Sequence, residues 1–462
     1  QLSATELARL IRSREVSPVE VVEAYLRRIG DVNPTLNAVV TLAPDALERA
    51  RAAEAAVAAG EELGALHGVP VTLKDTVDVR GLRTTYGSRV CAGHVPGEDA
   101  PAVGRLRAAG AVVLGKTNCP EFALDYTSEN PVFGRTNNPH DLGRTPGGSS
   151  GGCAAAVAAC MTAASVGSDL AGSVRIPAHF CGVAALKPTA GRVPGGGQLP
   201  PATGLHSLGA TPGPLARTVD DLKLLFGVLS GEDEARVTLK GVRVAFHIGG
   251  GPTAVTAETA EATRRAARAL ADAGLEVVEE APPGVGEATE LWLSLFEYAT
   301  QRFIRGMYAG REEEAGRAAR VILERGARWG EPALEKILAA WEERDRVRAT
   351  LLRWAERTPL YVAPVGAVPA FRHEEFGRVE FGGRGVSTFR AFAHSHAANV
   401  FDLPAVAVPA GRTRAGLPVG VQVVGRPFEE SRVLAAARVI EEALGGWRPP
   451  PEPLPKARGN PL

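Results

Sequence analysis

The sequence has no excess of charge of either sign, because 52 Lys and Arg residues are balanced by 52 Asp and Glu residues. Composition therefore indicates neither nucleic acid nor an anionic membrane surface as a partner. The sequence also lacks an apolar run of transmembrane length and an N-terminal stretch that is first basic and then apolar. We expect no membrane-spanning segment and no signal peptide.

Cysteine is scarce, and its spacing forms neither a disulfide framework nor a Cys-x-x-Cys site. An odd number of cysteines without such a pattern favours reduced thiols and a cytoplasmic protein. The histidines also lack zinc-site spacing, both in His394-x-His396 and in the run His373-Glu374-Glu375. We therefore expect no metal, and no cofactor is implied. The cysteines are Cys91, Cys119, Cys153, Cys160 and Cys181.

Hydrophobic residues make up 45% of the 462 residues, which is enough for a sizeable core. A strand–helix–strand order over residues 242–280 favours an α/β architecture. We predict a single domain over residues 1–462. Helical patterns dominate residues 287–357, which we interpret as a helical insert, and the Pro-rich residues 449–462 predict a surface coil tail.

Capping signals mark the first two helices, because Ser3 and Ser17 each stand three residues before a glutamate. Periodicity and the positions of Gly and Pro predict the other elements. The expected helices cover 45–59, 100–109, 153–164, 218–230, 256–273, 386–399 and 429–444, and the expected strands cover 36–41, 66–73, 111–114, 242–247, 275–280, 360–365, 403–409 and 418–424.

Two glycine-flanked serine sites lie close together in the chain, at Ser149-Ser150 and at Ser173. Glycines remove Cβ atoms, so the backbone there can approach a ligand or adopt torsions that other residues avoid. A serine hydroxyl is a weak nucleophile and needs a base. Apart from Asp169, no His, Asp or Glu lies within a helical turn of either site. Between the sites, the small apolar residues 153–164 predict a helix buried on all sides.

A candidate base lies upstream, where an apolar stretch predicted to be a strand ends in Lys74. A lysine at the end of such a strand is partly desolvated, which lowers its pKa, and a neutral lysine can accept a proton. We predict a relay in which Lys74 takes a proton from Ser149 and Ser149 takes one from Ser173.

These residues resemble the amidase signature hydrolases, whose pattern is a strand-end lysine, a G-G-S-S-G-G loop and a D-x-[GA]-G-S-[IV]-R loop. Here the three parts are Lys74, residues 147–152 and residues 169–175, and the serines have the family's usual spacing (173 − 149 = 24). The resemblance covers most of the chain, strongest over 66–186 and weaker over 367–447. One departure is Ala171, where many members have glycine.

The resemblance implies a fold and an activity. The implied fold is α/β, with a large mixed central β-sheet covered by helices on both faces. The implied activity is hydrolysis of amide C–N bonds, and the same machinery suits esters and carbamates, as in a urethanase. Ser173 is implied as the nucleophile that forms an acyl-enzyme, Ser149 as a bridging serine on a cis peptide bond, and Lys74 as the base.

Neighbouring residues are expected to support this triad. Asp169 and Arg175 are expected to pair and brace the nucleophile loop, while Ser150 either bonds within its loop or caps the following helix. Donors fixed where charge develops stabilise the transition state, so we expect an oxyanion hole in this loop. Its backbone N–H groups are those of Leu170, Ala171, Gly172 and Ser173.

Other interpretations remain open at this point. Residues 147–151 also fit G-x-S-x-G, the nucleophile elbow of α/β-hydrolases, but that motif needs a preceding strand and a triad histidine, and His179 and His206 have no flanking triad pattern. Within the amidase signature family, the glutaminase subunit of a tRNA-dependent amidotransferase is an alternative, although we find no glutamine-binding motif between residues 357 and 410. An amidase-like binding protein without catalysis is the alternative from another class.

Substrate choice is expected to come from two segments around the serines, the Gly/Pro-rich residues 191–214 and the helices that start near Glu287. Trp292, Phe296 and Phe303 are spaced to share one helical face, although such aromatic stripes more often belong to the core. An apolar face beside the site favours aryl amides or carbamates over free glutamine. We expect a small-molecule substrate and a monomer or homodimer.

Overall fold

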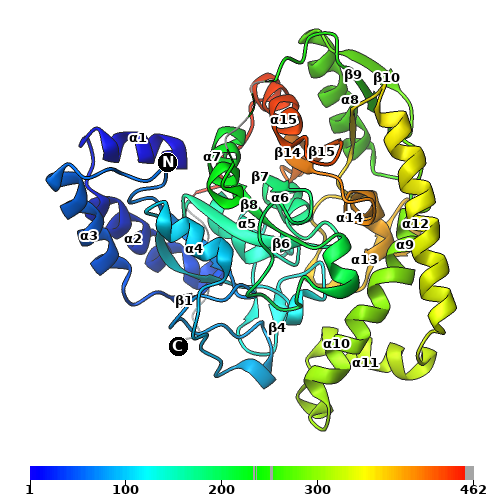
Figure 1. The fold of residues 1–462 in the computed structure, drawn as a ribbon, viewed down its shortest axis with the longest axis horizontal. Helices are drawn as coiled ribbons and strands as arrows, with labels where there is room; N and C mark the ends of the chain where they lie inside the picture. The colour runs from blue at the N-terminus through cyan, green and yellow to red at the C-terminus, as the bar shows by residue number, and fades with distance from the viewer. Residues whose placement is uncertain (233–234, 236, 250–252, 453–462) are drawn as a thin grey trace.

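An eleven-stranded mixed sheet forms the centre of the protein in a computed structural model that describes residues 1–232, 235, 237–249 and 253–452 (Figure 1). The strand order is β1-β3-β2-β6-β8-β7-β14-β15-β11-β9-β10. The strands are β1 (Val39–Leu42), β2 (Pro70–Lys74), β3 (Val112–Thr117), β6 (Ala164–Asp169), β7 (Ala184–Lys187), β8 (Thr211–Ala216), β9 (Arg243–Phe246), β10 (Glu276–Glu279), β11 (Leu360–Pro364), β14 (Ala405–Arg412) and β15 (Pro418–Gly425).

Alternate residues of the central strands enter two different cores, as the pleat of a strand requires. On β14, Val406 and Val408 pack into one core, whereas Ala405 and Ala407 pack into the other. Helices cover both cores, which confirms the predicted α/β class. The first core includes α1 (Ala4–Arg12), α2 (Pro18–Leu36), α3 (Ala46–Ala59), α4 (Pro101–Ala108), α7 (Val219–Ser230), α8 (Ala257–Asp272) and α15 (Glu430–Leu444); the second includes α6 (Arg175–Cys181), α9 (Ala288–Trp292), α12 (Leu334–Ala355) and α14 (His396–Val400).

Strands β2 and β6 are parallel neighbours, with Val71 opposite Ala164 and Leu73 opposite Val166. The carboxyl ends of parallel neighbours meet at the same edge of a sheet, which is where ligands bind in open α/β sheets. Lys74 ends β2 and Asp169 ends β6, so the fold itself brings these two positions together.

The predicted caps are present at the N-terminus. Ser3 Oγ accepts the Glu6 N–H at 3.1 Å, and Ser17 and Glu20 form a full capping box at the start of α2. Helices α3, α7, α8 and α15 lie within one residue of their predicted bounds.

Several predicted boundaries were wrong because sheet pairing overrides weak local preferences. Helix α5 (Gly151–Ala158) ends six residues before the predicted residue 164, since Ala164 already pairs with β2. Residues 211–214 belong to β8 rather than to a loop, although Pro212 and Pro214 lie in it. Both prolines pair with β6, and β7 pairs only further on, with Leu215 and Ala216.

Residues 386–399 were predicted as one helix and are instead four short pieces. They begin in the hairpin of β12 (Arg378–Phe381) and β13 (Arg384–Ser387), and continue as α13 (Thr388–Ala391), a short 3-10 turn and α14. The expected strand at 36–41 is likewise later, because Leu36 ends α2 and β1 begins at Val39. A second small hairpin joins β4 (Glu129–Asn130) to β5 (Gly134–Arg135).

Residues 287–357 are helical, as predicted, and lie at one side of the molecule in Figure 1. Besides α9 and α12 they contain α10 (Tyr298–Tyr308) and α11 (Arg317–Trp329), and a π-helical turn, Leu293–Glu297, joins α9 to α10. That this segment is an insert stays a prediction. Of the expected coil tail 449–462, residues 453–462 lie outside the described residues.

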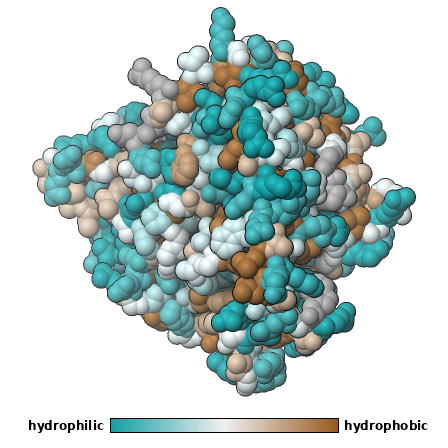
Figure 2. Space-filling model, turned by 45° about the vertical axis from the view of Figure 1, so that its right-hand side comes forward, coloured by the Kyte–Doolittle hydropathy of each residue, from teal (hydrophilic) through white to brown (hydrophobic). Residues whose placement is uncertain are grey.

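Hydrophilic side chains cover much of the face drawn in Figure 2, with hydrophobic residues in smaller groups among them. Within residues 1–232, 235, 237–249 and 253–452, we find no helix that combines the length and the apolar character needed to cross a membrane.

Candidate active site

Lys74 lies at the carboxyl end of β2 and its side chain is completely buried. Its Nζ donates to Ser149 Oγ at 2.6 Å and to Ser168 Oγ at 3.1 Å. No carboxylate of the described residues forms an ion pair with it. Burial without a counter-charge disfavours the ammonium form and lowers the pKa of Lys74 from 10.5 to about 8. The side chain is thus able to act as a base near neutral pH.

Ser149 follows a cis peptide bond from Gly148, as the family resemblance implied. Gly148 is required here, because a Cβ on this residue would lie 2.4 Å from the Asp125 carbonyl oxygen and 2.5 Å from that of Thr127. Gly147 adopts φ +85°, and Ser128 Oγ donates to its carbonyl at 3.0 Å. These contacts fix the loop that presents the Ser149 hydroxyl to Lys74.

Ser173 lies in the turn between β6 and α6 and is 8% exposed. Gly172 precedes it with φ +96°, and a Cβ there would clash with the Ser395 side chain at 2.7 Å. Ser149, Ser168 and Ser173 line the same cavity, which has a volume of about 440 Å³. Of the predicted triad, Ser149 and Ser173 thus share one cavity, and Lys74 joins them through its hydrogen bond to Ser149.

Ser150 bonds to residues outside its own loop and does not cap α5 with its side chain. Its Oγ donates to the Ser168 carbonyl at 3.3 Å, and its N–H donates to the Ser173 carbonyl at 3.0 Å. Neither interpretation left open for this residue, bonding within its own loop or capping the helix with its side chain, describes these bonds. Ser150 joins the two serine loops.

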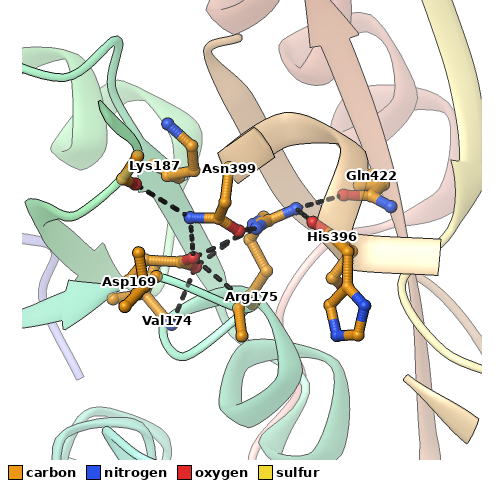
Figure 3. Close-up of polar contacts among 12 residues, drawn as sticks. Asp169, Val174, Arg175, Lys187, His396, Asn399 and Gln422 are labelled. Atoms are coloured by element: carbon orange, nitrogen blue, oxygen red, sulfur yellow. Dashed lines mark hydrogen bonds and ion pairs between the residues drawn. The ribbon is translucent and has the colours of Figure 1, made fainter. Parts of the chain in front are cut away.

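Asp169 and Arg175 form the predicted pair, and Figure 3 shows that it belongs to a larger buried network. Arg175 donates to both carboxylate oxygens of Asp169, at 3.0 and 3.2 Å, and to the side-chain oxygens of Asn399 and Gln422, each at 2.7 Å. Asn399 Nδ2 donates to Asp169 Oδ1 at 3.0 Å. Burial alone would raise the pKa of Asp169, but the Arg175 guanidinium and further donors hold this pKa well below its usual range.

One of the backbone N–H groups predicted for the oxyanion hole already donates to a side chain. The Gly172 N–H donates to Asp169 Oδ1 at 2.8 Å, which removes it from the expected set. The N–H groups of Ala171 and Ser173 donate to no acceptor among the described residues. The loop is also braced from outside, because Tyr126 Oη donates to the Ala171 carbonyl at 2.9 Å and Trp292 Nε1 to the Leu170 carbonyl at 2.8 Å.

The cavity walls come from both segments expected to govern specificity. Loop 191–214 contributes four residues, and His206 Nε2 lies 3.1 Å from Thr300 Oγ1 on α10, so the loop is tied to the helices. Trp292 lines the cavity, whereas Phe296 is fully buried in the core. Phe303 does not line the cavity but packs edge-on against Phe122, which does. Of the three aromatic residues predicted to share a face beside the site, only Trp292 lines the cavity. The loop residues are Gln198, Pro200, His206 and Ala210.

Several residues of the site were missed by sequence reasoning. Ser168, Tyr126, Asn399 and Gln422 each make a contact described above, but none stands in a local pattern that would single it out. Only the position of Ser168 beside Asp169 could have drawn attention to that serine. A second buried lysine, Lys116, lies 3.8 Å from Asp75 and was also missed.

The nucleophile-elbow interpretation is not supported. The short strand nearest before Ser149 is β5, which ends fourteen residues earlier (149 − 135 = 14). His179 is buried with both ring nitrogens engaged, Nε2 at 3.0 Å from the Val368 carbonyl and Nδ1 accepting the Gly420 N–H at 2.7 Å. Within the part of the chain that the structure describes, no three His, Cys, Asp or Glu side chains form a group that could hold a metal.

Comparisons with known proteins find relatives that match nearly the whole chain. The family model described as Amidase matches residues 20–434. One of the subunits of glutamyl-tRNA(Gln) amidotransferase from Anaeromyxobacter sp. (strain K) is 36% identical, and the alignment covers 97% of this chain and 99% of that protein. Among solved structures, 6-aminohexanoate cyclic dimer hydrolase complexed with its substrate is 31% identical with a TM-score of 0.85, covering 97% of this chain and 98% of that one. A chain of an unexpected vestigial protein complex, connected with the origins of an s-triazine catabolic enzyme, is 29% identical with a TM-score of 0.87, covering 97% and 99%.

Proposed function

Because the chain belongs to the amidase signature family, we propose that it is a serine hydrolase that cleaves C–N acyl bonds through an acyl-enzyme on Ser173. The observation that carries this proposal is the 2.6 Å hydrogen bond between Ser149 Oγ and the fully buried Lys74 Nζ. A buried lysine with a pKa of about 8 and a hydroxyl partner is suited to accept a proton from a serine relay.

The reaction begins with neutral Lys74, to which the Ser149 hydroxyl then donates its hydrogen bond. Ser173 Oγ attacks the carbonyl carbon, its proton passes to Ser149, and the Ser149 proton passes to Lys74. The N–H groups of Ala171 and Ser173 are proposed to hold the oxyanion, with Leu170 as a further donor. Protonation of the leaving amine through Ser149 breaks the C–N bond, and a water activated by the same relay hydrolyses the acyl-enzyme.

Apolar aryl amides or carbamates are proposed as better substrates than free glutamine. Most of the cavity wall is apolar, and residues such as Phe122, Leu124, Trp292, Ile322 and Phe389 contribute to it. An apolar wall stabilises an apolar group by roughly 25 cal/mol per Å² of surface removed from water. It offers no such gain to the charged backbone groups of glutamine.

A glutaminase-type subunit of a tRNA-dependent amidotransferase is the second candidate, and the name of the 36% identical relative favours it. In that case the chain would work with partner proteins. The absence of a glutamine-binding motif between residues 357 and 410, together with the apolar cavity, weighs against it. The hydrogen bond from Lys74 to Ser149, which lines the same cavity as Ser173, supports catalysis over the non-catalytic alternative.

A fluorophosphonate probe tests the nucleophile directly. We expect one adduct, on Ser173, and none in the Ser173→Ala variant. Mass-spectrometric mapping of the adduct to Ser149 or Ser150 would contradict the assignment. Ser207, a serine on the loop 191–214 that no proposed step uses, supplies the control variant Ser207→Ala, which should label like the wild type.

A substrate panel separates the two candidate functions. We expect turnover of anilides and aryl carbamates, and much slower hydrolysis of glutamine, when kcat/KM is compared for the isolated chain. Preferred hydrolysis of glutamine, or activity on glutamine that appears only with added partner proteins, would support the amidotransferase candidate instead.

A further inference from the structure

A carboxylate lies in the helical wall of the active-site cavity, away from the serines. Glu297, at the end of the π-helical turn Leu293–Glu297, lines the cavity with a side chain that is 8% exposed. Its Oε1 accepts Arg325 Nη1 at 2.8 Å and Gln301 Nε2 at 3.3 Å. Its Oε2 accepts no hydrogen bond from the described residues. A carboxylate oxygen has two lone pairs, so Oε2 can accept a donor from a ligand in the cavity.

A π-helical turn separates Trp292 from Glu297 in the cavity wall. In a regular α-helix, residues five apart point about 140° away from each other at about 100° per residue. A turn closed by i→i+5 hydrogen bonds instead stacks such residues nearly above one another. Leu293, Glu297 and Thr300 line the cavity at helical spacing, and the wider turn brings Trp292 closer to the face that they share. π-helical turns of this kind occur frequently at functional sites.

Trp292 connects the helix that carries Glu297 to the loop that carries Ser173. The indole Nε1 donates to the Leu170 carbonyl, three residues before Ser173, so this end of the helix touches the nucleophile loop. Glu297 stands five residues further along the same helix, at most about 7.5 Å along its axis at the α-helical rise of about 1.5 Å per residue. Apolar side chains that line the same cavity, Leu293 and Ile322, belong to this helix and to α11.

We propose that Glu297 binds a terminal amino group of the substrate, with Ser173 attacking a carbonyl that an apolar segment separates from that group. This inference rests on the proposed hydrolase function and adds a substrate class to it: amides or carbamates with an amino-terminated aliphatic or aryl arm. Glu297 is a binding residue in this proposal. Arg325 and Gln301 donate to Oε1, so the proposed acceptor for the ammonium is Oε2.

Another carboxylate that could attract an amino group is Asp125, which also lines the cavity. It lies beside the serine loop, since its carbonyl oxygen approaches Gly148, and its Oδ1 accepts the Tyr126 N–H at 2.5 Å. Burial raises the pKa of Asp125 to about 7, so it carries less charge than an exposed carboxylate near neutral pH. Asp169 is saturated by its own network, so Glu297 is the better acceptor.

Matched pairs of substrates test the proposal with the full chain. The first set consists of anilides whose acyl chain has four to eight atoms and ends in an amino or a methyl group. The second set consists of N-alkyl benzamides whose alkyl chain, on the amine side of the amide, ends in the same two groups. The readout is the amino-to-methyl ratio of kcat/KM. At one chain length the wild type should prefer the amino end, and Glu297→Leu should lower the ratio by about tenfold to a hundredfold, as expected for losing a hydrogen bond to a charged group. The methyl-terminated substrates measure any loss of activity that is common to both ends.

Controls make each outcome decisive. Glu343→Gln removes a carboxylate that pairs with Arg346 on the exposed face of α12 and should leave the ratio unchanged. Three results would each overturn the proposal. The first is an equal loss of kcat/KM for both ends in Glu297→Leu, and the second is no preference for the amino end in the wild type at any chain length. The third is loss of the preference in Asp125→Asn but not in Glu297→Gln. Failure of the hydrolase function itself would appear differently, as absent probe labelling and no turnover of either end.

Discussion

Replacing Asp169 by asparagine should be among the most damaging single changes in the chain. Arg175 is completely buried, and Asp169 is the carboxylate that pairs with it. Removing one partner of a buried ion pair leaves an uncompensated charge, which costs about 3–5 kcal/mol. The new amide would also point an NH₂ group at donors, because Gly172 and Val174 N–H groups, Asn399 Nδ2 and Arg175 all donate to the present carboxylate.

Urea denaturation followed by tryptophan fluorescence measures this loss, and fluorophosphonate labelling measures its effect on the nucleophile loop. We expect the unfolding midpoint of Asp169→Asn to fall sharply and the labelling of Ser173 to slow. The matched control is Glu261→Gln, in which the partner Arg268 and the carboxylate are both more than half exposed, and which should cost less than about 1 kcal/mol.

A double variant isolates the buried charge as the cause. Arg175→Met should cost less in the Asp169→Asn background than in the wild type, because it then removes an unpaired charge instead of breaking a pair. If Asp169→Asn is no more destabilising than Glu261→Gln, or if the two buried changes are additive, the network does not have the energetic role inferred from Figure 3.

Three further predictions concern catalysis. Lys74 accepts a proton only when neutral, and a pKa of about 8 makes its neutral fraction rise from about one tenth at pH 7 to about nine tenths at pH 9. We therefore expect kcat/KM to increase with pH and then level off. A flat or falling profile over this range would contradict the assignment of Lys74 as the base. Lys74→Ala should lower kcat by about a hundredfold or more with KM far less affected, so near wild-type kcat would refute it. Trp292→Phe keeps an aromatic ring but loses the donor to the Leu170 carbonyl, so labelling of Ser173 should slow for this variant, and unchanged labelling would show that this bond does not position the loop.

Local patterns were sufficient for the parts of the site that depend on backbone geometry. Lys74, Ser149 and Ser173 stand in glycine-rich or strand-end contexts whose spacing is visible in one dimension, and the parallel pairing of β2 with β6 then brings them together. The loop 191–214 was also recognised as part of the cavity wall, from its glycines and prolines.

Long-range partners could not be predicted in this way. Asn399 and Gln422 contact Arg175 across more than 220 residues of sequence, and neither belongs to a motif. Glu297 was hidden for another reason, since an α-helical periodicity assigns it a different face from Trp292 and no local signal announces the π-helical turn. The end of α5 was missed because alanines such as Ala159 and Ala163 favour a helix, whereas pairing of Ala164 with β2 decided the boundary.

The packing of helix α5 limits which substitutions this enzyme tolerates. Each of its residues is buried, and Cβ atoms on Gly151 and Gly152 would lie 2.3 Å from Ser128 Oγ and 2.4 Å from the Asn118 carbonyl oxygen. A helix without spare volume tolerates almost no enlargement of its side chains. The cavity wall at α10 and α11, by contrast, includes partly exposed positions such as Val321 and Arg325. Random mutagenesis should thus leave α5 nearly invariant among active clones, while new substrate preferences accumulate in the helical wall.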